Sequence, residues 1–200
     1  FLYVPATIGS IAWLAGNEDI VGNIRHGIVA SNLADSGGFT YKKSRFGRAG
    51  IDRAVEHVLE TSGVSYEVRD FVPYGYDERQ YCSPGFDLPV GSLSRTPYGE
   101  YPEYHTSADN LSFVSHDNLQ QSLDIYRKII DTLEAGRYFK NLLPKGEPQL
   151  GRRGLYKKVG GETDQKESQM AMLWLLNFSD GEHSVFDIAV MSGIAVDVID

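Results

Sequence analysis

The stretch DERQYCSPGFDLPVGSLSRTPYGEYPEYH, residues 77–105, is the part of the chain that decides the fold. It is rich in proline, glycine and tyrosine, and it contains one short strand-like run at residues 88–93. An irregular segment of this length inside a compact domain is usually functional or disordered, and its aromatic content argues against disorder. We therefore expect residues 77–105 to form ordered loops that carry chemistry.

The segments before this stretch alternate between strand-like and helix-like patterns. Strands are expected at residues 1–4, 26–32, 39–42 and 66–71, and helices at residues 8–15 and 51–61. This alternation is typical of a mostly parallel sheet covered by helices, in which ligands bind beyond the carboxyl ends of the strands. The loops after Val4, Asn32 and Phe71 are therefore the expected places for a functional site.

The segments after this stretch are mainly helical. An amphipathic helix is expected at residues 119–133, a surface segment at 141–156 and a polar linker at 160–166. Short helices at 168–177 and 184–192, joined by a turn at 179–181, and a third helix from residue 196 resemble the opening of a winged helix-turn-helix. A helical docking appendage is the alternative interpretation. We predict an α/β domain over residues 1–160 and a winged-helix-like segment over residues 161–200.

Composition restricts the class of protein. The 200 residues carry a formal net charge of −8, and neither lysine nor arginine occurs beyond Lys166, so nucleic-acid binding is not expected. The single cysteine, Cys82, cannot form a disulfide within the chain, which favours a reducing, cytoplasmic compartment. Neither a membrane-spanning apolar stretch nor a signal peptide is recognisable. The chain begins at Phe1 without an initiator methionine, and we expect both of its ends to be cut.

Polar side chains at three places are candidates for chemistry. Asp77 and Glu78 are carboxylates that suit a divalent metal or acid/base work, whereas Arg79 beside them also suits a structural ion pair. His105 lies in a polar loop where its imidazole suits a metal. Asp35 follows an expected strand, which suits a metal ligand or an ordinary turn. A catalytic thiol is not expected, and neither a phosphate-binding glycine loop nor a Gly-x-Ser-x-Gly motif occurs.

Four stretches resemble one bacterial family. They are VPATIGSIAWL at residues 4–14, YDERQYCSPGFDLP at 76–89, EYHTS at 103–107 and EPQLGRRGLY at 147–156. These stretches look like the aminopeptidase-like-domain proteins of unknown function, which are related to the clan of co-catalytic zinc aminopeptidases and glutamate carboxypeptidases. The resemblance implies the C-terminal portion of a three-layer α/β/α zinc-peptidase-like sheet and a site for one or two zinc ions.

The resemblance also implies roles for particular residues. His105, in Tyr-His-Thr, matches a histidine ligand, Asp35 matches an aspartate ligand after a central strand, and Asp77 matches a site aspartate. The clan's other ligands, a histidine and a bridging aspartate, come from a segment upstream of these motifs. The metal set expected in this chain is therefore Asp35, Asp77 and His105.

This chain differs from the clan at the position of the catalytic base. The glutamate that activates the metal-bound water is expected near residues 5–7, where this chain has Ala6. Loss of a general base removes a contribution of roughly 10²–10⁴-fold. Glu78 or Glu103 is the expected substitute. Glu78 and Arg79 are the expected catalytic residues, and Tyr81 and Tyr104 are expected to contact the substrate.

Two hypotheses of function follow. The first is a metal-dependent hydrolase of peptide or amide bonds, with a small molecule or peptide as its substrate. The second is a non-catalytic ligand-binding or regulatory protein on the same fold, which Ala6 and the helical tail favour. Both hypotheses are compatible with a homo-oligomer, and no membrane partner is expected.

Overall fold

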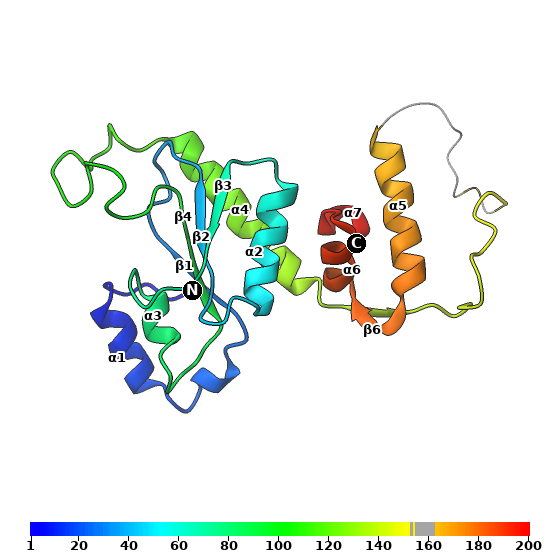
Figure 1. Cartoon of the computed structure of the whole chain (residues 1–200), viewed down its shortest axis with the longest axis horizontal. Helices are drawn as coiled ribbons and strands as arrows, with labels where there is room; N and C mark the ends of the chain where they lie inside the picture. Colours follow the sequence, from blue (N-terminus) through cyan, green and yellow to red (C-terminus); the bar gives the residue numbers. More distant parts are fainter. Residues whose placement is uncertain (153, 155–162) are drawn as a thin grey trace. The chain divides into compact units, whose positions relative to one another are not determined.

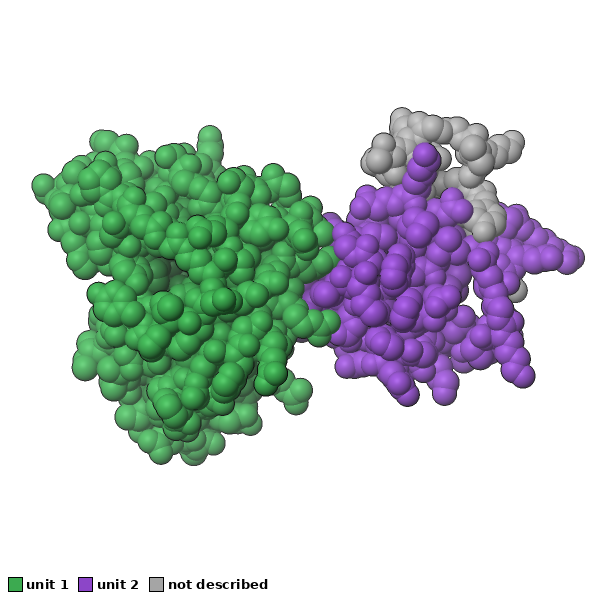
Figure 2. Space-filling view, in the orientation of Figure 1, with its two compact units in different colours: residues 1–127 green, residues 128–200 purple. Residues whose placement is uncertain are grey.

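The computed structural model describes residues 1–152, 154 and 163–200. The chain forms two compact units, Phe1–Arg127 and Lys128–Asp200, coloured separately in Figure 2. The boundary between these units lies earlier in the chain than the domain boundary predicted after residue 160. Most of the predicted linker at 160–166 lies outside the described residues, or has side chains that are not described.

The first unit is built on a four-stranded sheet (Figure 1). Its spatial order is β1 (Gly27–Ala30), β4 (Val90–Ser94), β2 (Phe39–Lys42) and β3 (Tyr66–Arg69). β1 pairs in parallel with β4 and β2 with β3, but β4 and β2 are antiparallel. The expected mostly parallel sheet is therefore a mixed one. The connection from β1 to β2 is too short for a crossover helix, so the chain turns back on itself.

The predicted helices of this unit are confirmed, and two further helical turns are added. They are α1 (Ile8–Gly16), η1 (Val21–Asn23), α2 (Gly50–Thr61), α3 (Glu78–Tyr81) and α4 (His116–Glu134), whose last residues, from Lys128 on, belong to the second unit. The strand predicted at residues 1–4 is wrong: these residues form no strand, and Phe1 and Tyr3 are almost fully exposed. A strand forms only where a neighbour satisfies its backbone hydrogen bonds, and no described strand pairs with this segment.

The two faces of the sheet differ. Phe39, Tyr41 and Leu93 point to one face and are almost completely buried. Tyr41 donates a hydrogen bond to Asp52 on α2, whose apolar side is equally buried, so α2 covers this face. At one end of the opposite face, α1, α3 and Val90 form a second apolar cluster. The remainder of that face carries polar side chains.

The second unit combines helices with a small sheet. β5 (Tyr138–Lys140) pairs antiparallel with β6 (Asp180–Ser184), and α5 (Thr163–Phe178), α6 (Val185–Ser192) and α7 (Val196–Ile199) pack together. The predicted turn at 179–181 is therefore the beginning of a strand. Ser184 caps α6, and Gly193, in a left-handed conformation, ends it. Among the described residues, no helix has the length and apolar character needed to cross a membrane.

Candidate functional site

The loops that follow β1 and β4 meet at the carboxyl edge of these parallel strands, as expected for such a sheet. Asp35, from the first loop, is almost completely buried. Its Oδ1 accepts hydrogen bonds from the Gly37 amide at 2.8 Å and from the hydroxyl and amide of Thr96 at 2.6 and 3.3 Å. Asp35 therefore holds the two loops together, and one of its oxygens is already saturated.

Arg95, which sequence reasoning did not single out, reinforces the same junction. Its guanidinium donates to the Leu33 and Gly37 carbonyls at 3.2 and 2.7 Å, and on α4 to Ser122 Oγ, the Asn118 carbonyl and Gln121 Oε1 at 3.0, 3.0 and 2.6 Å. Burial lowers the pKa of Arg95. Because all its donors except one N–H are used within the protein, Arg95 is a structural anchor.

Asp77 lies at the start of α3 and contacts a different element. Ser10 Oγ, on α1, donates to Asp77 Oδ2 at 2.9 Å, and Tyr81 Oη donates to Ser10 Oγ at 3.2 Å. Asp77 Oδ1 is buried and has no hydrogen-bond partner among the described residues. An unsatisfied buried carboxylate oxygen is costly, so it marks a candidate for a ligand, ion or proton. Tyr81, which was predicted to contact the substrate, is buried and uses its hydroxyl on Ser10, and its role in substrate binding stays a prediction.

Glu78 is completely buried and forms an ion pair with Lys42 of β2. The Lys42 ammonium also donates to the Tyr74 carbonyl at 2.7 Å. Gly75 has a φ of 147°, and a Cβ there would collide with both Lys42 and Glu78. Glycine at this position therefore makes the ion pair sterically feasible.

The remaining predicted site residues, Arg79 in α3 and Tyr104 and His105 in a loop, contact tyrosine rings. Arg79 places its guanidinium over the Tyr74 ring, 5.8 Å from the centroid. His105 is exposed, has a φ of 59° and stacks on Tyr104 with ring centroids 3.9 Å apart. Tyr104 in turn neighbours Tyr98, at 6.3 Å. His105 thus belongs to an aromatic cluster.

The predicted metal set does not converge in this structure. Within the part of the chain that the structure describes, no three His, Cys, Asp or Glu side chains are grouped closely enough to hold a metal ion. Asp35 uses Oδ1 on Thr96 and Gly37, whereas Asp77 has a free oxygen. Asp35, Asp77 and His105 therefore do not fit a zinc centre by themselves, and zinc binding stays a prediction.

A cavity of about 220 Å³ opens on the uncovered part of the sheet. We call it the open-face cavity. Strands β2, β3 and β4 form its floor, and the loops around residues 72–76 and 97–100 form its wall. Its lining residues are Thr40, Lys42, Arg69, Asp70, Val72, Tyr76, Ser92, Ser94, Pro97, Tyr98 and Glu100.

The strand register arranges the floor as two polar rows. Lys42 is paired with Ser92 on one side and with Arg69 on the other, which makes the first row. Thr40 is paired in the same way with Ser94 and Glu67, which makes the second. Paired residues on one face have Cβ atoms roughly 4.5–5.5 Å apart. Six polar side chains thus form a compact grid.

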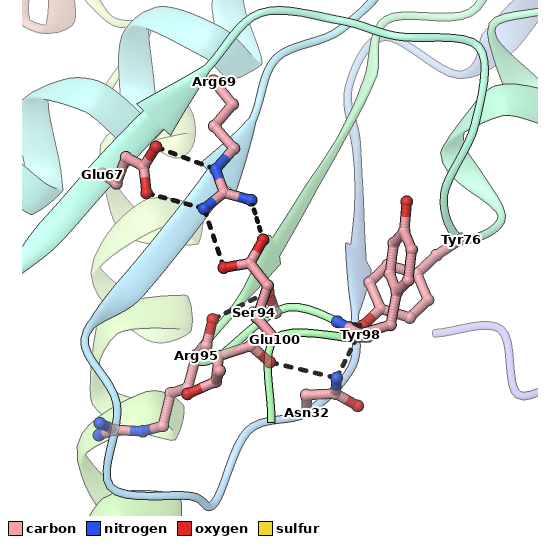
Figure 3. Close-up of polar contacts among 9 residues, drawn as sticks. Asn32, Glu67, Arg69, Tyr76, Ser94, Arg95, Tyr98 and Glu100 are labelled. Carbon is pink, nitrogen blue, oxygen red and sulfur yellow. Dashed lines mark hydrogen bonds and ion pairs between the residues drawn. The ribbon is translucent and has the colours of Figure 1, made fainter. Parts of the chain in front are cut away.

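Arg69 is held between two carboxylates at the edge of the cavity (Figure 3). Its Nε and Nη2 donate to Glu67 at 3.0 and 2.9 Å, and its Nη1 and Nη2 donate to Glu100 at 2.5 and 3.1 Å. These carboxylates raise the pKa of Arg69, with the Glu100 hydrogen bond contributing most. Glu100 is thereby fixed on a loop that has no regular structure of its own.

Tyr76 closes the opposite side of the cavity (Figure 3). Its hydroxyl accepts hydrogen bonds from Asn32 Nδ2 at 2.7 Å and from the Tyr98 amide at 3.0 Å, and burial raises its pKa. The Tyr76 and Tyr98 rings meet edge to face, with centroids 5.1 Å apart. The loops after β1, β3 and β4 are therefore joined around one wall.

Two hydroxyls in the floor have no hydrogen-bond partner among the residues that the structure describes. Ser92 is buried and Thr40 is half-buried, and neither side chain forms a hydrogen bond with any described residue. A hydroxyl that lines a cavity and has no protein partner is available to water or to a ligand. These two hydroxyls can therefore donate hydrogen bonds to a small polar ligand in the open-face cavity and accept hydrogen bonds from it.

Comparisons with known proteins agree with a division into two parts. The family described as a domain of unknown function (DUF4910) matches residues 1–136, and a winged helix-turn-helix family matches residues 137–200. The second match confirms the winged helix predicted in the C-terminal part.

One relative comes from Clostridium acetobutylicum and is provisionally named a polysaccharide biosynthesis protein with aminopeptidase-like domain. It is 51% identical over 194 residues, which cover 97% of this chain and 44% of the relative. A crystal structure from the same organism, provisionally described as a peptidase, is 48% identical with a TM-score of 0.86, over 98% of this chain and 43% of that one. The chain thus spans less than half the length of these relatives.

Proposed function

Starting from the fact that the chain belongs to the DUF4910 family, we propose that its aminopeptidase-like domain binds a peptide or another amide-bearing compound in the open-face cavity. The observation that carries this proposal is the polar floor with its two unpartnered hydroxyls, Thr40 and Ser92. An amide offers one acceptor and at least one donor in fixed geometry, which suits hydroxyls that can do both. The names of the two relatives, aminopeptidase-like and peptidase, support an amide as the recognised group.

The position of the cavity supports the same proposal. Loops carry binding residues more often than the strands that they connect. Asn32, Tyr76 and Thr96 come from three such loops and are joined by hydrogen bonds beside the cavity. Residues from three separate loops are therefore fixed next to the polar floor.

The test is a titration of the ¹⁵N-labelled chain with N-acetylglycinamide, an uncharged compound with two amides. We expect chemical-shift changes at residues 40–42 and 92–94, and weaker binding in Ser92→Ala by about fivefold, the loss of one hydrogen bond. Ser112→Ala is the matched control, because Ser112 lies on an exposed loop and does not line the cavity. Shifts at other places, or equal affinity in both variants, would contradict the proposal.

A second candidate function, hydrolysis of an amide, is favoured by Asp77, although Asp77 does not itself line the open-face cavity. Its buried Oδ1 is free, and Ser10 fixes the other oxygen, which is the arrangement expected of a group that accepts a proton from water. Water would add to the carbonyl carbon, the C–N bond would break, and the amine would leave with a proton. Two observations argue against hydrolysis. Ala6 stands where the clan has its glutamate, and the predicted metal ligands are not grouped in the described part of the chain.

Hydrolysis is tested on the full-length protein, purified without chelator, with aminoacyl p-nitroanilides as substrates and metal content measured on the same sample. Turnover that is lost in Asp77→Asn, while N-acetylglycinamide still binds, would establish the second candidate. Stoichiometric zinc in the purified protein would support the predicted cofactor. Binding without turnover in any sample would leave ligand binding as the function.

A further inference from the structure

We infer that the ligand of the open-face cavity carries an uncharged, hydroxylated sugar ring. This inference rests on the proposed function, because it concerns the same cavity, and it names the chemical class that the amide-bearing ligand belongs to. Three properties of the lining carry it: the pairing of its charges, the spacing of its hydroxyls and the presence of two tyrosine rings.

The charges of the lining are already paired inside the protein. Two cations and two carboxylates line the cavity, namely Lys42, Arg69, Asp70 and Glu100. Lys42 is bound by Glu78 and the Tyr74 carbonyl, and Arg69 lies between Glu67 and Glu100. An anionic ligand would have to compete with these carboxylates. Asp70 is exposed at the rim, where an ion pair with an ammonium is worth only about 0–1 kcal/mol. The cavity therefore favours a neutral ligand.

The polar grid suits a ligand with several hydroxyl groups. Thr40 and Ser92 are each able to donate and accept, and Glu100 keeps lone pairs beyond those used by Arg69. Thr40 and Ser92 belong to neighbouring rows on adjacent strands, so they face different parts of one small molecule. A peptide backbone offers such groups along a line, whereas a sugar ring offers them around its edge.

The wall of the cavity supplies the apolar contact that a sugar ring needs. Tyr76 and Tyr98 lie at 88° to each other, so one ring presents its edge to the other. Ring C–H groups of a sugar pack against aromatic carbon as other apolar groups do. Tyr76 is anchored because its Oη accepts hydrogen bonds from Asn32 and from the Tyr98 amide, and the Tyr98 ring packs against the rings of Tyr76 and Tyr74.

The size of the cavity limits the ligand to one ring. Cavities that hold drug-sized molecules measure roughly 300–1,000 Å³. At about 220 Å³, the open-face cavity is smaller than this range and accommodates a single monosaccharide unit rather than an oligosaccharide. Further units, or an attached peptide, would extend out of its mouth.

The inference is tested by parallel ¹⁵N titrations of the 200-residue chain with N-acetylglucosamine, glucose and N-acetylglycinamide. These probes carry both ring and amide, ring alone and amide alone. We expect N-acetylglucosamine to bind most tightly, glucose to bind detectably, and both to weaken by about fivefold in Thr40→Val and Ser92→Ala. Ser112→Ala should bind all three probes as the unmodified chain does.

Each outcome separates the inference from the proposed function. Binding of both sugars but not of N-acetylglycinamide upholds the sugar ring and contradicts an amide as the recognised group. Binding of N-acetylglycinamide alone overturns the sugar ring and upholds the proposed function. If no probe shifts residues 40–42 or 92–94, both fail.

Discussion

The two faces of the four-stranded sheet differ in whether their polar groups have hydrogen-bond partners within the protein. On the covered face, Asp52 accepts hydrogen bonds from Tyr41 Oη, the Ser44 amide and hydroxyl, and the Ala49 amide, at 2.6–2.8 Å. On the open face, the hydroxyls of Thr40 and Ser92 have no protein partner in the described part of the chain. Tyr41 and Thr40 are adjacent in β2, so one strand carries both a hydroxyl that is bonded within the protein and a hydroxyl that is not.

This difference shows how a structural polar group is distinguished from a functional one. A carboxylate that accepts four hydrogen bonds within the protein has a structural role, because its removal leaves the four donors unsatisfied. A hydroxyl without a partner adds little to stability and is available to a ligand. The comparison therefore predicts large stability effects on the covered face and small ones on the open face.

The largest effect is expected for Asp52→Ala on the covered face. Three buried donors and the half-buried Ala49 amide lose their acceptor, which should lower the free energy of unfolding by about 3 kcal/mol. Urea denaturation followed by circular dichroism measures the loss. Asp52→Asn, which keeps one acceptor oxygen, should lose less, and a change below about 1 kcal/mol in Asp52→Ala would remove the distinction between the faces.

A smaller effect is expected from the ionisation of Tyr41. Burial and the neighbouring Asp52 raise its pKa far above the ordinary value of 10.0. A raised pKa gives a contribution to stability that is complete below the unfolded pKa of about 10 and declines above it, by up to about 1.4 kcal/mol per pH unit. Urea denaturation at pH 9 and pH 11 should show a shallower decline for Tyr41→Phe than for the unmodified chain. Equal declines would mean that Tyr41 ionises freely.

The smallest effect is expected for Thr40→Val on the open face. The substitution keeps the side-chain shape and removes a hydroxyl that has no partner, so the free energy of unfolding should change by less than about 0.5 kcal/mol. The same urea denaturation measures it. A loss comparable to that of Asp52→Ala would show that the open face is as structural as the covered one.

The candidate site was only partly predictable from the sequence. The strand–helix alternation pointed to the loops after Asn32 and Phe71, which carry Asp35 and Tyr76, but it did not predict a cavity on the face of the sheet with β2, β3 and β4 as its floor. The partners were not predictable, because Thr96 lies 61 positions from Asp35 and Lys42 lies 36 positions from Glu78. A sequence shows which residues follow a strand, but not which loops fold onto one another.

The missed features share one cause. Arg95, the Lys42–Glu78 ion pair and the polar grid all depend on contacts between distant segments. The grid depends on the register between strands, because a shift of one residue would turn each of its side chains to the other face. The register is set by the packing of Phe39, Tyr41 and Leu93 under α2, which is a tertiary event. The strand expected at residues 1–4 does not form, for a related reason: an apolar run becomes a strand only where a partner strand is present.

The sequence by itself determined the helices, most of the strands and the winged-helix character of the C-terminal part. These depend on local periodicity and capping, such as Ser184 and Gly193 around α6, which act within a few residues. Only the tertiary structure decided that β2 runs antiparallel to β4, that Asp35 binds Thr96, and that Thr40 and Ser92 share one cavity. These features join residues that are distant in the chain, and their energy comes from burial and hydrogen bonds that exist only after the strands have aligned.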